Sequence, residues 1–321
     1  MLFLYTIVFV ISCILIYYSG HHLISSLIRI ARFLGWKEFV VAFFIMAFAG
    51  SLPNLSLGIF SAFKKIPQLS FGDVIGGNVI DLTLAIGLAV LFVRGGGIIS
   101  NSRVVQTSAI FTLIAAILPL IMVLDKEISR LDGFLLIIFF FIYIFWLFSK
   151  KERFTKVYEK TEKFSTFQDF KNFLIDLIKV IFSIVLLLLA TQGIIKSSQF
   201  FAEFFNLPLI LIGLLIVALG NALPEIYFSI ISAKKGETWL ILGNLMGAVI
   251  GAGALVLGIV AVICPIKDLE ISTAIIARIF LFLSAVFFFF FIRSDRELTK
   301  KEGFFLLLIY VVFVIIELLA K

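Results

Sequence analysis

Two short segments decide how this sequence is organised: AFAGSLPN at residues 47–54 and ALGNALPE at residues 218–225. They match at an offset of 171 positions, and the same offset aligns the residues that follow without a gap. It pairs Ser61-Ala62 with Ser232-Ala233, Lys64 with Lys235, Gly72 with Gly243 and Gly76 with Gly247. A chance match would not keep one register over such a length with Gly, Pro and Lys coinciding. The sequence therefore predicts an internal repeat.

Around these segments the chain is strongly apolar. Hydrophobic residues make up 62% of it and charged residues 15%, with a mean hydropathy of +1.19. The apolar residues come in runs of about 20, the length that spans a bilayer, and buried core helices cannot account for nearly every segment at once. We predict ten transmembrane spans, at residues 2–19, 38–62, 70–93, 104–124, 132–149, 173–195, 206–232, 238–263, 271–292 and 303–320.

The offset fixes the relation between the two copies of the repeat. It crosses five predicted spans, an odd number, so the second copy lies upside down relative to the first, as in many secondary transporters. We therefore expect an all-α polytopic membrane protein with ten transmembrane helices in two inverted five-helix repeats. The first repeat covers residues 1–149, a linker covers 150–172, and the second repeat covers 173–321.

Lys and Arg predict the orientation, because they concentrate in cytoplasmic loops. The loops after the odd-numbered spans hold most of them, including seven between Lys150 and Lys171, which places the linker in the cytoplasm and both termini outside. This bias accounts for the net charge of +7, so nucleic-acid binding is not expected. The first span has no basic residue before it and no small-residue cleavage site after it, which predicts a retained helix. Because the 150–172 linker is too short for a regulatory domain, we expect a plasma-membrane location.

Each copy of the repeat has a proline inside an apolar span, Pro53 in the first and Pro224 in the second. Proline removes a backbone donor and strains the preceding turn, so we expect both helices to be broken there. The carbonyls near residues 47–50 and 218–221 would then lack their usual partners. At membrane depth such carbonyls are tolerated where they line a polar cavity or bind an ion. Simple packing with a kink is the structural alternative.

Polar side chains gather at the same depth, where ionisable groups are rare and usually functional. Glu225 follows Pro224, and Asn54 takes the equivalent place after Pro53. The next span of the first copy carries Asp73, Asn78 and Asp81, whose partners by the offset are Asn244, Val249 and Ala252. Ser51 and Asn221 precede the two prolines. For Asp73, capping of a helix break is an alternative role.

These residues offer oxygen ligands, which hard cations prefer. The two histidines, His21 and His22, and the two cysteines, Cys13 and Cys264, lie elsewhere in the sequence, so a soft metal is not expected. Two carboxylates balance one divalent cation or two monovalent ones, and this equivalence is a physical basis for exchange. No cofactor is expected, and no pattern typical of a hydrolase or protease is present.

At this point the residues resemble a known family. GSLPN at 50–54 and GNALPE at 220–225, each followed by Ser-Ala, a lysine loop and a glycine-rich span, resemble the alpha repeats of sodium/calcium exchangers in the cation/calcium antiporter superfamily. The resemblance covers the whole chain. It implies sodium-driven calcium exchange by alternating access, with the first and sixth spans sliding. The cation ligands that it implies, together with those reasoned above, are Glu225, Asp81, Asn54, Ser51, Asn221, Ala47, Ala218, Asn78 and Asp73.

The sequence departs from the family pattern at several expected ligands. The first glutamate is Asn54, and Ala222, Ala248 and Ala252 replace polar residues in the second copy. Sodium/proton or other cation exchange on the same fold therefore stays open, as do a passive cation channel and a regulator that does not transport. Among the remaining charges, Asp176 and Lys179 are expected to pair, whereas Arg278 is expected to reach the interface or face the protein interior.

Overall fold

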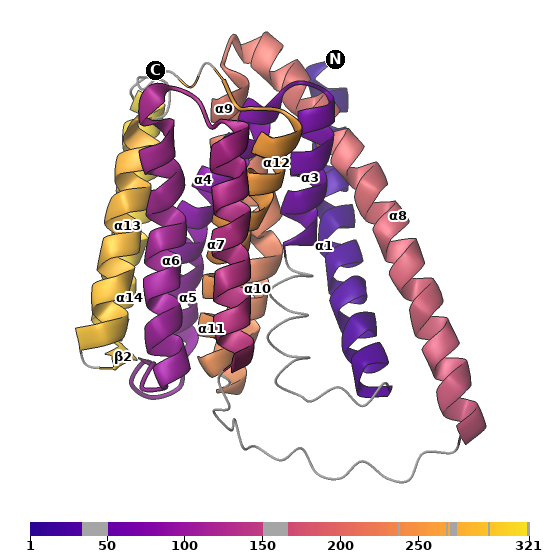
Figure 1. Ribbon diagram of the computed structural model, residues 1–321, viewed down its shortest axis with the longest axis vertical. Coiled ribbons are helices and arrows are strands. Elements are labelled where there is room, and N and C mark those ends of the chain that lie inside the picture. Colours follow the sequence, from indigo (N-terminus) through magenta and orange to yellow (C-terminus); the bar gives the residue numbers. More distant parts are fainter. Residues whose placement is uncertain are drawn as a thin grey trace.

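The computed structural model describes residues 1–33, 51–149, 166–236, 238–267, 269, 275–294 and 296–319. The protein is an upright bundle of long helices (Figure 1). Within the described residues, nine helical stretches are long and apolar enough to span a membrane. Of the predicted second span, only the part from residue 51 onward is described, and it contains the shorter helix α3. The helices are α1 (Leu2–Phe33), α3 (Leu52–Phe63), α4 (Pro67–Ile80), α5 (Ile86–Phe92), α6 (Arg103–Met122), α7 (Arg130–Ser149), α8 (Thr166–Phe205), α9 (Leu209–Ile212), α10 (Ala218–Lys235), α11 (Thr238–Ile250), α12 (Leu257–Ile263), α13 (Ile275–Ser294) and α14 (Lys300–Leu319).

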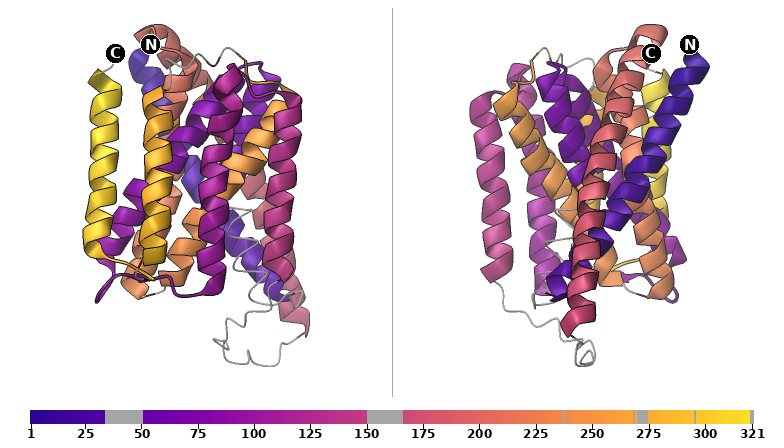
Figure 2. Two further views of the ribbon diagram at one scale, coloured as in Figure 1. Left: turned by 60° about the vertical axis from the view of Figure 1, so that its left-hand side comes forward. Right: turned by 90° about the vertical axis from the view of Figure 1, so that its right-hand side faces the viewer.

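The predicted spans agree with the helices within a few residues, except for the two first helices of the repeats. α1 continues to Phe33, well past the predicted end at residue 19, and α8 covers 40 residues instead of the predicted 173–195. The polar residues that suggested ends do not stop these helices, because their side chains find partners within the helix. Ser25 Oγ, for example, donates to the His21 carbonyl at 2.8 Å. α1 and α8 pack against each other (Figure 2).

The expected break at Pro224 is not present. α10 runs from Ala218 to Lys235 with Pro224 inside it, so this prediction was wrong. The departure from α-helical geometry comes about two to three turns earlier, in the π-helical segment η4 (Gly213–Val217). Two further π-helical segments, η2 (Asp81–Ala85) and η5 (Gly251–Val256), interrupt the helices that follow in each repeat. A π turn widens the helix and disturbs its backbone hydrogen bonding without ending it, and such turns are frequent at functional sites.

The inverted repeat is visible in the bounds of these elements. When shifted by 171 positions, α4 begins at the first residue of α11, and α5 has the same bounds as α12. η2 shifted in the same way falls within η5. The loops show the same relation at opposite ends of the bundle. β1 (Ile98–Ile99) pairs antiparallel with β2 (Glu297–Leu298) at one end, and Ile128 pairs with Ile266 at the other (Figure 1). The fold class predicted from the sequence is thus confirmed.

In each repeat, two helices pack closely against helices of the other repeat at glycine positions. α5 of the first repeat packs on α14, and α12 of the second packs on α7. A Cβ on Gly87 would lie 2.8 Å from the Gly303 carbonyl oxygen, and one on Gly133 would lie 2.7 Å from that of Gly258. Glycine is needed at these positions because each backbone approaches its neighbour directly, which is typical of helix packing in membranes.

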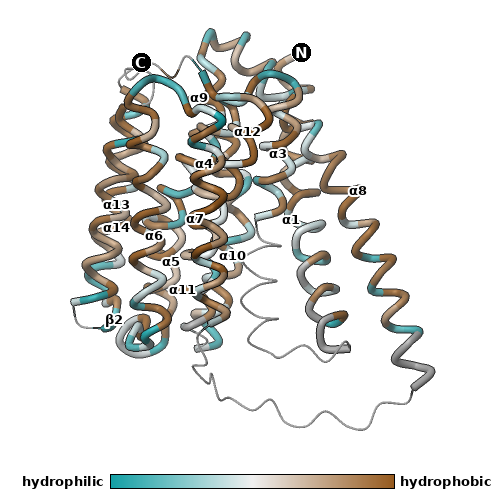
Figure 3. Tube along the Cα trace, viewed as in Figure 1, coloured by the Kyte–Doolittle hydropathy of each residue, from teal (hydrophilic) through white to brown (hydrophobic). Residues whose placement is uncertain are grey.

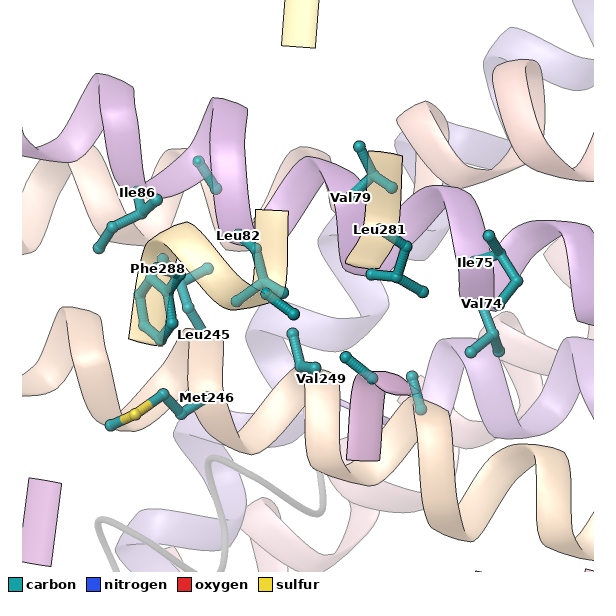
Figure 4. Close-up of a cluster of buried hydrophobic side chains, with 14 of the residues drawn as sticks. Val74, Ile75, Val79, Leu82, Ile86, Leu245, Met246, Val249, Leu281 and Phe288 are labelled. Carbon is teal, nitrogen blue, oxygen red and sulfur yellow. The ribbon is translucent and has the colours of Figure 1, made fainter. Parts of the chain in front are cut away.

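The two packed repeats share one hydrophobic core, whereas lipid-facing positions surround it. Val79, Leu82 and Ile86 of the first repeat meet Val249 and Leu245 of the second (Figure 4). Hydrophobic residues follow the middle of the helices, and hydrophilic ones concentrate towards both ends and in the loops (Figure 3). Exposed apolar side chains line the outer faces of α7, α8, α13 and α14. This distribution is that of a protein embedded in a bilayer.

Isolated charges outside the core have partners of their own. Asp176 of α8 lies 3.8 Å from Lys179, as expected, but its closer partner is Arg29 of α1, at 2.7 Å. Arg278 faces inward, and its guanidinium lies 5.8 Å from the centre of the Phe71 ring. Cys13 is buried in the packing between α1, α8 and α10, whereas Cys264 is half-buried.

Candidate functional site

The first part of the candidate site is the acidic face of α4 and η2. Asp73 lies in the middle of α4, Asn78 near its end, and Asp81 is the first residue of the π-helical segment η2. All three side chains are buried, with 2%, 2% and 6% of their surface exposed. Gly72 and Gly76 bring this helix against α9, η4 and α10, since a Cβ on either would strike the backbone there. Close packing therefore holds the acidic residues away from lipid.

The second part of the site is the face of α10 that begins at Ala218. Asn221 and Glu225 are four residues apart and so lie on neighbouring positions of one helical face. Both are buried. Asn221 Nδ2 donates to Asp73 Oδ1 at 3.0 Å, which joins the two halves of the protein at this level. Ala218 itself is fully buried beside Gly76 and Ile80.

The three carboxylates form one electrostatic group. Asp73 on α4 and Asp81 on η2 lie on one side of the contact with α10, and Glu225 of α10 lies on the other. Asp176 pairs with Arg29 and Lys179 away from this group, and no ion pair to Asp73, Asp81 or Glu225 is found among the described residues. Buried carboxylate charges without a partner cation are costly at membrane depth, so this group favours the binding of a cation or a proton.

The atoms that lack partners here are mainly oxygens. Each of the five polar side chains described above on α4, η2 and α10 has one buried oxygen that makes no hydrogen bond among the described residues. These oxygens are Asp73 Oδ2, Asn78 Oδ1, Asp81 Oδ1, Asn221 Oδ1 and Glu225 Oε2. Such acceptors suit a hard cation. Within the same residues no three His, Cys, Asp or Glu side chains stand close enough to hold a metal ion by themselves. A cation bound here would therefore need amide, hydroxyl or backbone oxygens as well.

The residues of α3 contribute a more neutral surface. Ser51 is buried at the start of α3, and its hydroxyl lies against Gly251 of η5, where a Cβ would strike it. Asn54 is half-buried one turn later. Ala222, the residue that corresponds to Ser51 in the second repeat, packs against Ile80. Ala47, the remaining predicted ligand, lies outside the described residues. Asp73, Asn78, Asp81, Asn221 and Glu225 are thus grouped where α4 and η2 meet α10, whereas Ser51 lies against η5.

Three polar residues near these helices were not among the predicted ligands. Ser70 of α4, Ser229 of α10 and Asn244 of α11 each have a buried polar atom without a partner. Ser229 lies one turn beyond Glu225, so the four-residue spacing Asn221-Glu225-Ser229 was the signal that would have identified it. The sequence carries no comparable signal for the position of Gly77, where a Cβ would meet no heavy atom of the described residues within 4 Å.

Comparisons with known proteins agree with this architecture. A family model described as sodium/calcium exchanger protein matches residues 4–149 and 176–319. An uncharacterized membrane protein of Methanocaldococcus jannaschii is 25% identical over 315 residues, with 95% of each chain covered. The sodium/calcium exchanger MaX1 of Methanosarcina acetivorans is 22% identical and covers 93% of this chain and 94% of its own.

Solved structures show the same fold. A structure of the sodium-calcium exchanger NCX_Mj, soaked with sodium and strontium, superimposes with a TM-score of 0.67 at 21% sequence identity and covers 98% of both chains. The family match spans most of the sequence in two stretches, which agrees with the two repeats found in the fold. On these grounds the chain is a multi-pass membrane transporter that belongs to the sodium/calcium exchanger protein family.

Proposed function

We propose that the protein is a sodium-driven calcium antiporter whose transported ions bind between α4–η2 and α10. One observation carries this proposal: Asp81 and Glu225, which come from opposite repeats, are both buried where η2 packs against α10 and form no ion pair with a cation among the described residues. The related proteins MaX1 and NCX_Mj are named as sodium/calcium exchangers, which supports the choice of sodium and calcium.

The chemistry of exchange follows from the charge of this pair. One calcium ion or two sodium ions neutralise two carboxylates equally, so either set of ions permits the rearrangement that changes the exposed side. An empty site would leave two buried charges uncompensated, and the free energy of that state would oppose the rearrangement. The site therefore changes sides only with ions bound, so transport of one load is followed by return with an equivalent load, which is the defining property of an antiporter.

The surroundings of the site supply elements for the movement. η2, η4 and η5 place weakened helical geometry at the level of the ligands, where small shifts of the backbone cost little. α1 and α8 pack on each other, and an ion pair between Arg29 of α1 and Asp176 of α8 joins them. We infer that these two helices slide together across the α3–α10 side of the bundle as access alternates.

The proposal includes an orientation in the plasma membrane. Lys and Arg place the 150–172 linker in the cytoplasm and both termini outside. Both ends of the chain lie at one end of the bundle, and the helices that flank the linker reach the other end, which is consistent with this arrangement (Figure 1).

Exchange of sodium or another cation against protons is a second candidate, and Asn54 favours it. The amide places one charge fewer on α3 than the family pattern has, so the ligands for calcium are reduced. Glu225 or Asp81 would then carry the proton. A passive channel and a non-transporting regulator make different predictions, and the same experiment separates all four.

The test is flux through the purified protein in proteoliposomes loaded with sodium. We expect uptake of radiolabelled calcium that stops when the sodium gradient is removed with an ionophore. Proton movement coupled to sodium, with no effect of calcium, would establish the second candidate instead. Unitary currents would indicate a channel, and absence of all cation flux would indicate a regulator. Either of these outcomes would contradict the proposal of an antiporter.

A further inference from the structure

The contact between α3 and α8 contains a buried pair of hydroxyl groups in apolar surroundings. Leu57 of α3 belongs to the same buried cluster as Ile194 and Ile195 of α8. Within this contact, Ser56 Oγ and Thr191 Oγ1 lie 2.7 Å apart, and the two residues are only 8% and 0% exposed. Such a pair is commonly a means of holding membrane helices together. The hydrogen bonds available to these two hydroxyls indicate a different role.

The pair contributes little adhesion, because its two protons have three possible hydrogen bonds. Ser56 Oγ lies 2.9 Å from the Pro53 carbonyl oxygen, and Thr191 Oγ1 lies 2.8 Å from that of Leu187, so each hydroxyl has an acceptor in its own helix. Each hydroxyl carries one proton. A proton that joins the two helices is therefore withdrawn from one of these carbonyls. Two hydrogen bonds are made whether the helices touch or separate, and separation leaves no donor without a partner.

α8 is held much more firmly by α1 than by α3. Arg29 of α1 donates to both carboxylate oxygens of Asp176 on α8, at 2.7 and 2.9 Å, and charge-assisted bonds of this kind are the strong ones. The contact with α3 instead ends in two like charges. Partial burial and the positive charge of Lys196 on α8 lower the pKa of Lys64, in the turn after α3. The α3–α8 contact is therefore the weaker of the two and the easier to open.

Water would change the balance of forces at this contact. Ser56 lies on α3 between Asn54 and the end of the bundle that carries both chain termini (Figure 1). If α3 and α8 separate toward that end, water enters, and both hydroxyls gain it as a further partner. Methyl groups at the same two positions would instead lose their burial. A hydroxyl pair therefore suits a dry contact that opens to water and closes again.

We propose that Ser56 and Thr191 are positioning residues for exchange, which let the α3–α8 contact open to water on the side of the termini and close again. This inference rests on the proposed function. The offset of 171 places Tyr227 at the position of Ser56 in the second repeat, and its ring meets that of Tyr17 on α1, with centroids 5.6 Å apart. Serine and threonine readily bond the backbone of their own helix, whereas the distant tyrosine hydroxyl does not. The hydroxyl pair therefore serves one side of the protein only.

The experiment measures opening of the contact by the rate at which a membrane-impermeant maleimide labels Leu57→Cys in proteoliposomes. The background protein carries Cys13→Ser and Cys264→Ser, so that it has no other thiol. Leu57 is 2% exposed, and a cysteine there reacts when the contact opens. Ser56→Ala combined with Thr191→Val makes the contact apolar, and we expect labelling to slow about tenfold, because opening no longer hydrates two hydroxyls.

Two matched variants separate this effect from a change in packing. Thr191→Ser keeps both hydroxyls and should label at the unmodified rate. Thr112→Val removes a buried hydroxyl of α6 that donates to the Ser108 carbonyl of its own helix, at 2.9 Å, and it should also label at the unmodified rate. Transport supplies a second measurement. In the Ser56→Ala/Thr191→Val protein, sodium-driven calcium uptake should slow about tenfold while equilibrium calcium binding stays within about twofold, since the ligands are untouched.

A disulfide provides an independent test if the apolar variant does not fold. Ser56→Cys with Thr191→Cys places two thiols at the contact, and we expect oxidation to stop calcium uptake and reduction to restore it. The control is Ile98→Cys with Leu298→Cys, which are directly paired between β1 and β2. Uptake should continue when that disulfide forms, because the ribbon joins parts that are not proposed to separate.

Labelling of the Ser56→Ala/Thr191→Val protein at the unmodified rate or faster would overturn the proposal. Continued uptake by the oxidised Ser56→Cys/Thr191→Cys protein would also overturn it. The labelling rate does not depend on calcium transport, so it can contradict the role of the hydroxyl pair while antiport persists. Absence of calcium uptake by the unmodified protein would instead refute the proposed function itself.

Discussion

The helices that follow the proline segments, α4–η2 in the first repeat and α11–η5 in the second, share one backbone plan but differ in charge. Both change from α to π geometry at equivalent positions. α4–η2 carries Asp73 and Asp81, whereas α11–η5 has Asn244 and Ala252 there. The proline helices show the reverse, with Glu225 on α10 and Asn54 on α3. The negative charge is thus concentrated where α4–η2 meets α10, which suggests that an inverted repeat can keep its mechanics symmetric while its ion site becomes one-sided.

The largest effect should come from removing Glu225, the carboxylate that the second repeat contributes to the candidate site. Glu225→Gln preserves the shape of the side chain but removes one of the two negative charges that are proposed to bind calcium, so that Asp81 would bind it alone. We expect sodium-driven calcium uptake to fall by about a hundredfold or more, because a buried charge interaction is lost in the bound state. Glu203→Gln, at an exposed position near the end of α8, is the control and should transport normally. Uptake by Glu225→Gln at the control rate would break the comparison.

Restoring a negative charge to α3 should sharpen the comparison between the two repeats. Asn54→Glu places a carboxylate at the position that corresponds to Glu225, and a further negative charge near the site should favour calcium. We expect the calcium concentration for half-maximal uptake to fall about tenfold, the effect of an interaction of about 1.4 kcal/mol. Asn101→Glu makes the same change on the exposed surface. Equal affinities for these two variants would mean that α3 does not face the ions.

Stability should distinguish two adjacent glycines of α4. Gly76→Ala inserts a methyl group against the backbone of η4, and we expect a loss of about 2 kcal/mol that lowers the thermal unfolding temperature in detergent. Gly77→Ala meets no heavy atom of the described residues within 4 Å and should change stability by less than about 0.5 kcal/mol. Similar unfolding temperatures for both variants would contradict the packing of α4 on η4.

The smallest effect concerns the contact between the first helices of the two repeats. Arg29→Gln removes the 2.7 Å ion pair with Asp176, and Arg29 is roughly half exposed. We expect a loss of about 1 kcal/mol in stability, with calcium uptake in sodium-loaded vesicles close to normal. Lys179→Gln should have no measurable effect, since that pair is longer, at 3.8 Å, whereas Arg29 donates hydrogen bonds to the Asp176 carboxylate. A larger loss for Lys179→Gln would reverse the assignment of the principal partner.

Much of the fold follows from the sequence, because span length and the 171-residue offset are properties of the sequence itself. The break at Pro224 could not be predicted correctly, since a proline in a span fits a kink, a break or a continuous helix with a π turn nearby, and only packing decides among them. The lengths of α1 and α8 were underestimated because their polar residues have partners within the helix or across the α1–α8 contact. That contact is invisible in a single segment.

The site was predicted in part for a similar reason. The sequence identified Glu225, Asp81 and Asp73 by their depth, and the structure brings them together. It did not predict that Asn221 would bind Asp73, since this hydrogen bond joins residues 148 positions apart. It also did not reveal that a Cβ on Gly77 would meet no heavy atom of the described residues within 4 Å, because a closely packed glycine and one without such neighbours are identical in sequence. The roles of all these residues as ion ligands remain predictions.

The central claim is that Asp81 and Glu225, from opposite repeats, bind one calcium ion together. Equilibrium binding of radiolabelled calcium to the purified protein, in competition with sodium, tests it most directly. We expect Asp81→Asn to lose calcium binding by at least about tenfold in affinity, while Asp125→Asn binds as the unmodified protein does and sodium displaces the calcium. Calcium binding by Asp81→Asn that equals the control, with the same competition by sodium, would contradict the account.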